Sequence, residues 1–152
     1  MIKIMFVCHG NICRSPMAEY IMRDMLEKAG RRDVLVASCA TSTEEIWNGV
    51  GNPVYPPVKR LLEARGISCD GKRAVQLKKT DYGEYDAFFV MDSNNLRNAL
   101  RIFGGDPEGK VKKLMEVTGS SKDVSDPWYT RDFEATESDL IKACEFLVEF
   151  FV

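Results

Sequence analysis

The sequence has a single histidine, His9, among its 152 residues. A Ser–His–Asp triad, or a metal site built from histidines, would have to use this one side chain. Neither a CxxC pair nor an HExxH motif is present, so a zinc site is not expected. The sequence therefore predicts chemistry that needs neither a metal nor another cofactor.

Cysteines are few and odd in number, which excludes most disulfide-stabilised secreted folds. The five are scattered along the chain: Cys8, Cys13, Cys39, Cys69 and Cys144. The apolar-rich run at the N-terminus, residues 2–7, is too short for a signal peptide or a membrane span. We therefore expect a protein of the reducing cytoplasm.

Net charge is also small, at -2. This value predicts no affinity for nucleic acid or for an acidic membrane, so any attraction for anions must be local. Hydrophobic residues make up 45% of the chain and charged residues 29%, enough for a core and a soluble surface. We expect residues 1–152 to form one domain, and we expect a monomer.

Short apolar runs alternate with segments of helical periodicity. Strands are predicted at Ile2–Val7, Val34–Ala37 and Ala87–Met91, with a weaker one at Val111–Val117. Helices are predicted from Ser15 to Gly30, from Pro53 or Pro57 to Gly66, from Asp92 or Ser93 to Gly104, and from the capping arrangement at Thr136–Asp139. The alternation is typical of an α/β domain with three layers, in which helices cover both faces of a parallel sheet.

The segment after the first strand has the composition of a phosphate loop. It consists of Cys8, His9, Gly10, Asn11, Ile12, Cys13, Arg14 and Ser15. Main-chain N–H groups in such a turn converge on an anion, and the dipole of the following helix adds to the attraction. Gly10 and Asn11 tolerate the backbone conformations that a tight turn needs.

Two side chains in this loop are suited to covalent phosphate chemistry. Five residues separate Cys8 from Arg14, so the loop can wrap one tetrahedral phosphate between thiol and guanidinium. The positive surroundings favour the thiolate form of Cys8, to which Ser15 can donate a hydrogen bond. The alternative is that Cys8 is a small buried residue in a tight turn, but the whole string at a strand-to-helix junction favours catalysis.

Four segments together resemble the low-molecular-weight protein tyrosine phosphatases. They are the string Cys8–Pro16, Thr41-Ser42, Met91–Leu96 and Asp126-Pro127-Trp128-Tyr129, in the family's order. The resemblance implies a four-stranded parallel sheet and metal-free hydrolysis through a phosphocysteine. It also implies a tyrosine-phosphorylated protein or peptide as substrate, with free phosphate or another oxyanion able to bind in the loop.

The resemblance also implies roles for residues outside the loop. By the resemblance, Asp126 is the general acid and then the general base. Without the resemblance, Asp126-Pro127 and the aromatic residues after it would indicate only a turn stiffened by proline. Trp128 and Tyr129 form walls for the substrate ring, and Trp47 forms an opposing wall unless it is a loop anchor. Asn11 and Ser42 brace the phosphate loop by hydrogen bonds.

Two positions depart from the family's usual pattern. Lys72 stands where histidine is common, and Val75 stands where arginine is common. These changes put the family's hydrogen-bond network around the two positions in doubt. They leave the nucleophile Cys8, the phosphate-binding Arg14 and the acid Asp126 unchanged. Within the loop, Cys13 has two open interpretations: it protects an oxidised Cys8 as a reversible disulfide, or it is a packing residue.

Two other functions use a similar loop. A thioredoxin-coupled arsenate reductase on the same fold needs a downstream pair of cysteines, yet residues 75–95 contain none. A non-catalytic phosphate-binding module needs the loop but no proton donor. The combination of Cys8, Arg14 and Asp126 favours the phosphatase over both.

Overall fold

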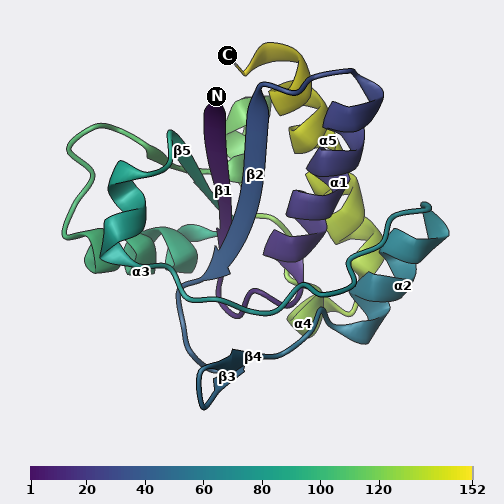
Figure 1. The fold of residues 1–152 in the computed structure, drawn as a ribbon, viewed down its shortest axis with the longest axis horizontal. Coiled ribbons are helices and arrows are strands. Elements are labelled where there is room, and N and C mark those ends of the chain that lie inside the picture. Colours follow the sequence, from purple (N-terminus) through teal and green to yellow (C-terminus); the bar gives the residue numbers. More distant parts are fainter. Residues whose placement is uncertain (152) are drawn as a thin grey trace.

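Four parallel strands form the centre of the computed structural model, which describes residues 1–151 (Figure 1). The strands lie in the order β2 (Val34–Ala40), β1 (Ile2–Cys8), β5 (Ala87–Val90) and β6 (Val111–Lys113). All three pairings are parallel. The predicted fold class, an α/β domain with a four-stranded parallel sheet, is confirmed.

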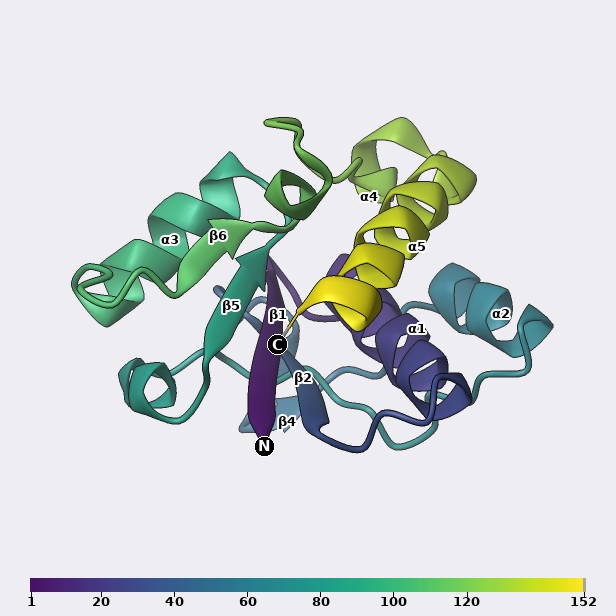
Figure 2. The same ribbon diagram turned by 90° about the horizontal axis from the view of Figure 1, so that it is seen from above.

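Strand β1 is buried on both faces because its side chains alternate between two cores. Ile4 and Phe6 pack with helices α1 (Arg14–Lys28) and α5 (Phe133–Phe150) on one face. Met5 and Val7 pack on the other face, with α3 (Ser93–Phe103). Figure 2 shows α1 and α5 on one side of the sheet and α3 on the other. The layers are those that the alternating sequence predicts.

The remaining helices are shorter and lie at the periphery. They are α2 (Pro56–Ala64), α4 (Pro127–Thr130) and two 3-10 helices, η1 (Lys79–Gly83) and η2 (Leu114–Thr118). None of the helices within residues 1–151 is long and apolar enough to cross a membrane.

The carboxyl ends of β1, β2 and β5 meet at one edge of the sheet. Cys8 is level with Ala40 on β2, and Val7 is level with Val90 on β5. The loop 9–13, the segment after β2 and the start of α3 therefore leave the sheet at the same place. Ligands bind at this edge in open α/β sheets.

The predicted second strand, Val34–Ala37, is longer in the structure, and the segment after it has regular structure of its own. Strand β2 continues to Ala40, and β3 (Ile46–Trp47) and β4 (Val50–Gly51) form a small antiparallel hairpin. Gly51 is required there, because a Cβ atom would lie 1.9 Å from the carbonyl oxygen of Ala74. Figure 1 shows this hairpin below the sheet, on the side where α4 also lies.

Two predicted boundaries are wrong. The strand predicted at Val111–Val117 ends at Lys113, and η2 follows, because the adjacent Leu114 and Met115 are both buried. Alternation along a strand would have directed these two side chains to opposite faces of the sheet, whereas both pack in the core formed with α1 and α5. The last helix begins at Phe133 rather than near Thr136, since Asp132 provides the N-cap by accepting a hydrogen bond from the N–H of Ala135.

Helix α3 has the ends that the sequence predicts. The Asp92 carboxylate caps its N-terminus by accepting from the N–H of Asn95 at 2.7 Å. Gly104 ends the helix in the left-handed conformation, with φ of 76°. This cap fixes the Asp92 side chain at the same edge of the sheet as the phosphate loop.

Candidate active site

The loop between β1 and α1 curls back over the end of β1. Asn11 has a φ of 58°, a left-handed conformation that asparagine adopts more readily than most residues. This turn brings the N–H of Asn11 to 3.3 Å from Cys8 Sγ. The helix begins at Arg14, two residues earlier than the prediction of Ser15 as N-cap and Pro16 as first helical residue, and Ser15 is fully buried within its first turn.

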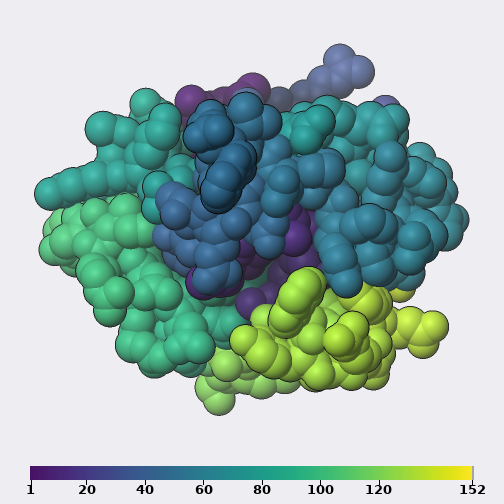
Figure 3. Space-filling model, turned by 90° about the horizontal axis from the view of Figure 1, so that it is seen from below, coloured from purple at the N-terminus to yellow at the C-terminus, as the bar shows by residue number. Residues whose placement is uncertain are grey.

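A pocket of about 540 Å³ opens above this loop. Its floor includes Cys8, Cys13 and Arg14, and its walls come from the segment after β2, from α3 and from α4. Figure 3 shows atoms of the N-terminal segment, in purple, at the bottom of a hollow between the blue and yellow-green segments. The pocket thus gathers residues that are distant in sequence.

Arg14 lies almost completely buried beside the nucleophile candidate, with 3% of its surface exposed. Its guanidinium donates to the carbonyl oxygen of Val124 at 3.0 Å and to Asp92 Oδ2 at 2.9 Å. A longer contact of 3.4 Å joins it to Asp126 Oδ2. Burial alone would lower the pKa of Arg14, but the negative charges of Cys8, Asp126 and Asp92 outweigh it and raise the pKa. The cation is therefore permanent.

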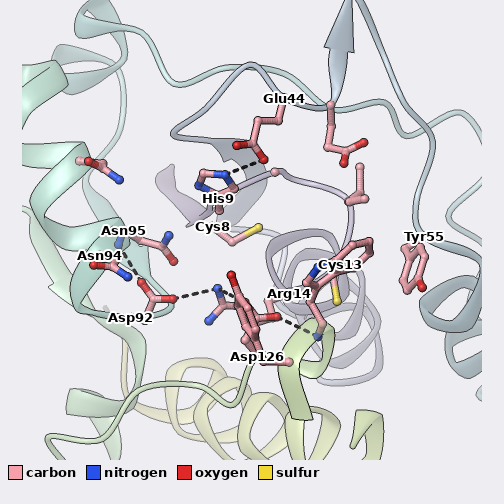
Figure 4. Close-up of a pocket in the computed structure, with 16 residues that line it drawn as sticks. Cys8, His9, Cys13, Arg14, Glu44, Tyr55, Asp92, Asn94, Asn95 and Asp126 are labelled. Atoms are coloured by element: carbon pink, nitrogen blue, oxygen red, sulfur yellow. Dashed lines mark hydrogen bonds and ion pairs between the residues drawn. The ribbon is translucent and has the colours of Figure 1, made fainter. Parts of the chain in front are cut away.

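Asp126 caps the short helix α4 and faces the same pocket (Figure 4). Its Oδ1 accepts from the N–H of Trp128 at 3.0 Å, which leaves Oδ2 directed toward Arg14. The structure thus brings Asp126 together with Cys8 and Arg14, although more than 110 residues separate the acid from both. Geometry allows it to exchange a proton with a group bound in the pocket.

A chain of hydrogen bonds runs beneath the loop from Glu19 to Cys8. The Ser38 hydroxyl donates to Glu19 Oε1 at 2.5 Å, so its oxygen must accept from Asn11 Nδ2 at 2.9 Å. Asn11 Nδ2 also donates to the Ser15 hydroxyl oxygen at 2.8 Å. The Ser15 proton is then directed either to Cys8 Sγ, 2.9 Å away, or to the carbonyl oxygen of Cys39 at 3.4 Å, and the sulfur is the nearer of the two. Because a carboxylate only accepts, Glu19 fixes the direction of the Ser38 hydroxyl, and the Asn11 NH₂ group donates to both serine oxygens.

The two departures from the family pattern lie around this chain. Lys72 Nζ is 3.6 Å from Glu19 Oε1 and donates to the Ser38 carbonyl oxygen at 3.1 Å. Together with Arg23, it balances the charge of the buried Glu19 carboxylate. Val75 contributes only its main-chain N–H, which donates to Asn11 Oδ1 at 3.0 Å. The network is complete with lysine and valine at these positions.

The structure gives Ser42 a different contact from the predicted bracing one. Its hydroxyl accepts from the N–H of Glu44, and only its main-chain N–H reaches the loop, donating to the carbonyl oxygen of His9. Ser38 makes the bracing contact instead. Ser38 lies in β2 with its side chain buried, whereas Ser42 lies beyond the end of that strand.

Trp47 does not line the pocket. It belongs to the hairpin and is 79% exposed. Trp128 instead packs against Tyr55, with the two ring centroids 5.6 Å apart, so these two rings form one wall of the pocket. Sequence reasoning missed Tyr55, although its position before Pro56 and Pro57 at the start of α2 is a signal that its side chain is held in place. Tyr129 stands at the mouth of the pocket and is largely exposed.

His9 and Cys13 lie on the rim and in the floor of the loop. His9 Nε2 is 2.9 Å from Glu44 Oε2, a contact that links the loop to the segment after β2 (Figure 4). Cys13 is a free thiol, like Cys8. Burial and the neighbouring Cys8 raise the pKa of Cys13, so it stays protonated at neutral pH. Gly10 and Ile12 also line the pocket.

Within residues 1–151, no group of three or more histidine, cysteine, aspartate or glutamate side chains is arranged to hold a metal ion.

The fold and the loop define a cysteine-centred oxyanion site at the edge of a parallel sheet. Comparisons with known proteins agree with this class. The family model described as low molecular weight phosphotyrosine protein phosphatase matches residues 3–150. The chain belongs to this family of protein phosphatases, which are hydrolases.

Individual relatives cover almost all of the chain. The low molecular weight protein-tyrosine-phosphatase YfkJ of Bacillus subtilis is 36% identical over 97% of this chain and 94% of its own. PtpA of Staphylococcus aureus is 34% identical over 100% and 95%. The crystal structure of YfkJ superposes with a TM-score of 0.90, covering 98% of this chain and 93% of that one. A structure of the YwlE arginine phosphatase is 26% identical, with a TM-score of 0.83 and coverage of 97% and 94%.

The direction of the hydrogen-bond chain can be tested with Ser38→Ala. This change removes both the donor to Glu19 and an acceptor of Asn11, so Ser15 is less firmly directed at Cys8. We expect alkylation of Cys8 by iodoacetate at neutral pH, and kcat, each to fall about two- to tenfold, the value of one hydrogen bond.

Ser68→Ala is the matched control, since the Ser68 hydroxyl only accepts from the N–H of Asp70 in a surface turn. Both rates should equal the wild-type rates in this control. Unchanged alkylation in Ser38→Ala would show that Ser15 is directed at Cys8 without help from Glu19.

Proposed function

We propose that the protein hydrolyses tyrosine phosphate in proteins through a phosphocysteine on Cys8. The observation that carries this proposal is the buried hydrogen-bond chain that ends at Cys8 Sγ, in the same pocket as Arg14 and Asp126. A hydroxyl that donates to the sulfur favours the thiolate, which is the nucleophilic form. Arg14 lies where a phosphate above that sulfur would meet its guanidinium.

The reaction has two steps. The Cys8 thiolate attacks phosphorus, the bond to the tyrosine oxygen breaks, and Asp126 gives its proton to that oxygen. A water molecule then attacks phosphorus and gives a proton to Asp126, the P–S bond breaks, and phosphate leaves. Loop amides and the planar fork of Arg14 stabilise the equatorial oxygens in both steps.

Tyrosine is the substrate residue that the pocket walls favour. Ile12, Tyr55 and Trp128 are apolar or aromatic and line the space above Cys8. A phenyl ring packs well against such walls. A phosphorylated guanidinium, the substrate that the name of the YwlE phosphatase indicates, needs carboxylates instead. Asp92 and Asp126 already pair with Arg14.

The oligomeric state, compartment and partners of the enzyme are proposed from its composition, charge and site residues. We propose that the enzyme acts as a monomer in the cytoplasm and needs neither metal nor cofactor. Its partners are then the phosphorylated protein and the phosphate that it releases. Thioredoxin-coupled arsenate reduction and non-catalytic phosphate binding are the alternatives, and neither needs the proton donor at Asp126.

Cys8→Ser tests the proposal as a whole. A serine hydroxyl is nearly isosteric but is not ionised at neutral pH, so turnover should be abolished while phosphate still binds. The measurements are hydrolysis of phosphotyrosine and phosphoarginine peptides in the presence of a chelator, and phosphate binding by calorimetry. Cys144→Ser, a change at a buried cysteine on α5, is the control and should retain activity.

Substantial hydrolysis by Cys8→Ser would exclude Cys8 as the nucleophile. Faster turnover of the phosphoarginine peptide by the wild type would replace tyrosine with arginine as the substrate residue. A wild type that binds phosphate but hydrolyses neither peptide would favour the non-catalytic module.

The acid role predicts a leaving-group dependence for Asp126→Asn. An amide cannot supply a proton, so tyrosine phosphate should slow about 10²–10⁴-fold. Esters with leaving groups of low pKa should lose much less, since they depart without protonation. The measurement is the rate of cysteine phosphorylation for a series of aryl phosphates. Equal losses across the series would remove Asp126 from the acid role.

We also propose that Cys13 protects Cys8 from irreversible oxidation. A thiolate at Cys8 oxidises first to a sulfenic acid, which a neighbouring thiol can trap as a disulfide. Peroxide should therefore inactivate the wild type reversibly, with activity restored by a thiol reductant. Cys13→Ser should be active when reduced but should not recover after peroxide. Full recovery of this variant would leave Cys13 as a packing residue.

A further inference from the structure

The pocket extends beyond the phosphate loop along the start of α3. Its volume of about 540 Å³ includes a wall formed by Asn94, Asn95 and Asn98, here called the asparagine wall. Cavities that hold whole drug-sized ligands span roughly 300–1,000 Å³, so this space exceeds what one phosphorylated side chain needs. Figure 4 shows Asn94 and Asn95 on the opposite side of Cys8 and Arg14 from Tyr55.

The outer two asparagines are oriented by arginines one turn further along the helix. Arg97 donates to Asn94 Oδ1, and Arg101 donates to Asn98 Oδ1 at 3.1 Å. A guanidinium can only donate, so each amide must turn its oxygen toward its arginine. The NH₂ groups of Asn94 and Asn98 then have no hydrogen-bond acceptor among the residues that the structure describes.

Asn95, the inner residue of the asparagine wall, gives the strongest indication of a bound ligand. Asn95 is 1% exposed, and its main-chain N–H is bonded to Asp92. Its side-chain Oδ1, however, is buried without a hydrogen-bond partner in the described part of the chain. Figure 4 shows this side chain directed from α3 toward the centre of the pocket. Buried polar atoms are nearly always paired, so an unpaired one at a pocket wall indicates a ligand.

We propose that the asparagine wall binds the polypeptide main chain next to the phosphorylated residue. An asparagine amide has the same donor and acceptor as a peptide group, so the wall matches main-chain carbonyls and N–H groups. The three asparagines carry no charge themselves; Asp92 beside them is paired with Arg14, and Arg97 and Arg101 contact the amide oxygens of Asn94 and Asn98. Recognition of this kind is independent of the substrate's side chains. The proposal rests on the proposed hydrolysis of phosphoproteins.

The double variant Asn94→Ala/Asn98→Ala tests the wall with two substrates that share the same chemistry. One is a phosphotyrosine peptide and the other is 4-nitrophenyl phosphate, which has no main chain. Loss of two hydrogen bonds should lower kcat/KM for the peptide about tenfold, through KM, and leave the aryl phosphate within about twofold. Lys59→Ala/Glu63→Ala is the control: it removes an exposed ion pair on α2 that does not line the pocket, and both substrates should behave as with the wild type.

A second measurement identifies the main chain as the bound group. A peptide in which the bonds flanking the phosphotyrosine are esters lacks the N–H donors and has weaker carbonyl acceptors. The wild type should lose affinity for this peptide, and the double variant should lose much less, because the two changes remove the same contacts.

The outcomes are distinct. The proposal for the asparagine wall is wrong if Asn94→Ala/Asn98→Ala loses equal activity on the peptide and the aryl phosphate, or loses none on either. It is also wrong if the ester peptide weakens binding equally in the wild type and the double variant. In all three cases the wild type still hydrolyses the peptide. If the wild type hydrolyses neither substrate, or only the aryl phosphate, the proposed function itself fails and the wall is rejected with it.

Discussion

The buried carboxylate of Glu19 is the constraint on which the phosphate loop depends. It sits in α1 with almost no exposure, and it can only accept hydrogen bonds. Ser38 on β2 must therefore donate to it, and Asn11 must donate to Ser38 and to Ser15. The same Asn11 holds the left-handed turn that folds the loop. The buried carboxylate thus lies at one end of a hydrogen-bond chain that passes through Asn11 of the loop and ends at Ser15 beside Cys8.

The parallel sheet makes this chain possible. Because β1 and β2 run side by side in the same direction, Ser38 lies level with Phe6, just below the end of β1. Helix α1 then returns along the sheet and brings Glu19 against β2. An antiparallel neighbour would place the residues at its own N-terminal end there instead. The fold therefore determines which side chains can support the nucleophile.

Sequence patterns predicted the layers, the loop and the ends of α3 because those features depend on local periodicity, capping and glycine. They could not show that Ser38 rather than Ser42 braces the loop, since that depends on the register of β1 against β2. Tyr55 in place of Trp47 is a similar case. The hairpin after β2 directs Trp47 outward, and only the packing of α2 brings Tyr55 to the ring of Trp128. Contacts between residues that are distant in the sequence cannot be predicted from the spacing of residues along the chain.

Two carboxylates share Arg14, and their surroundings assign them different tasks. Asp92 is held at 2.9 Å from the guanidinium and also caps α3, an eleven-residue helix packed on the sheet. Asp126 makes a longer contact, 3.4 Å, and caps α4, which has four residues. A positioning residue needs rigid support, whereas a proton donor must approach the leaving oxygen and then a water molecule. In the proposed mechanism, Asp92 therefore holds Arg14 in place, and Asp126 is the carboxylate left free to carry the proton.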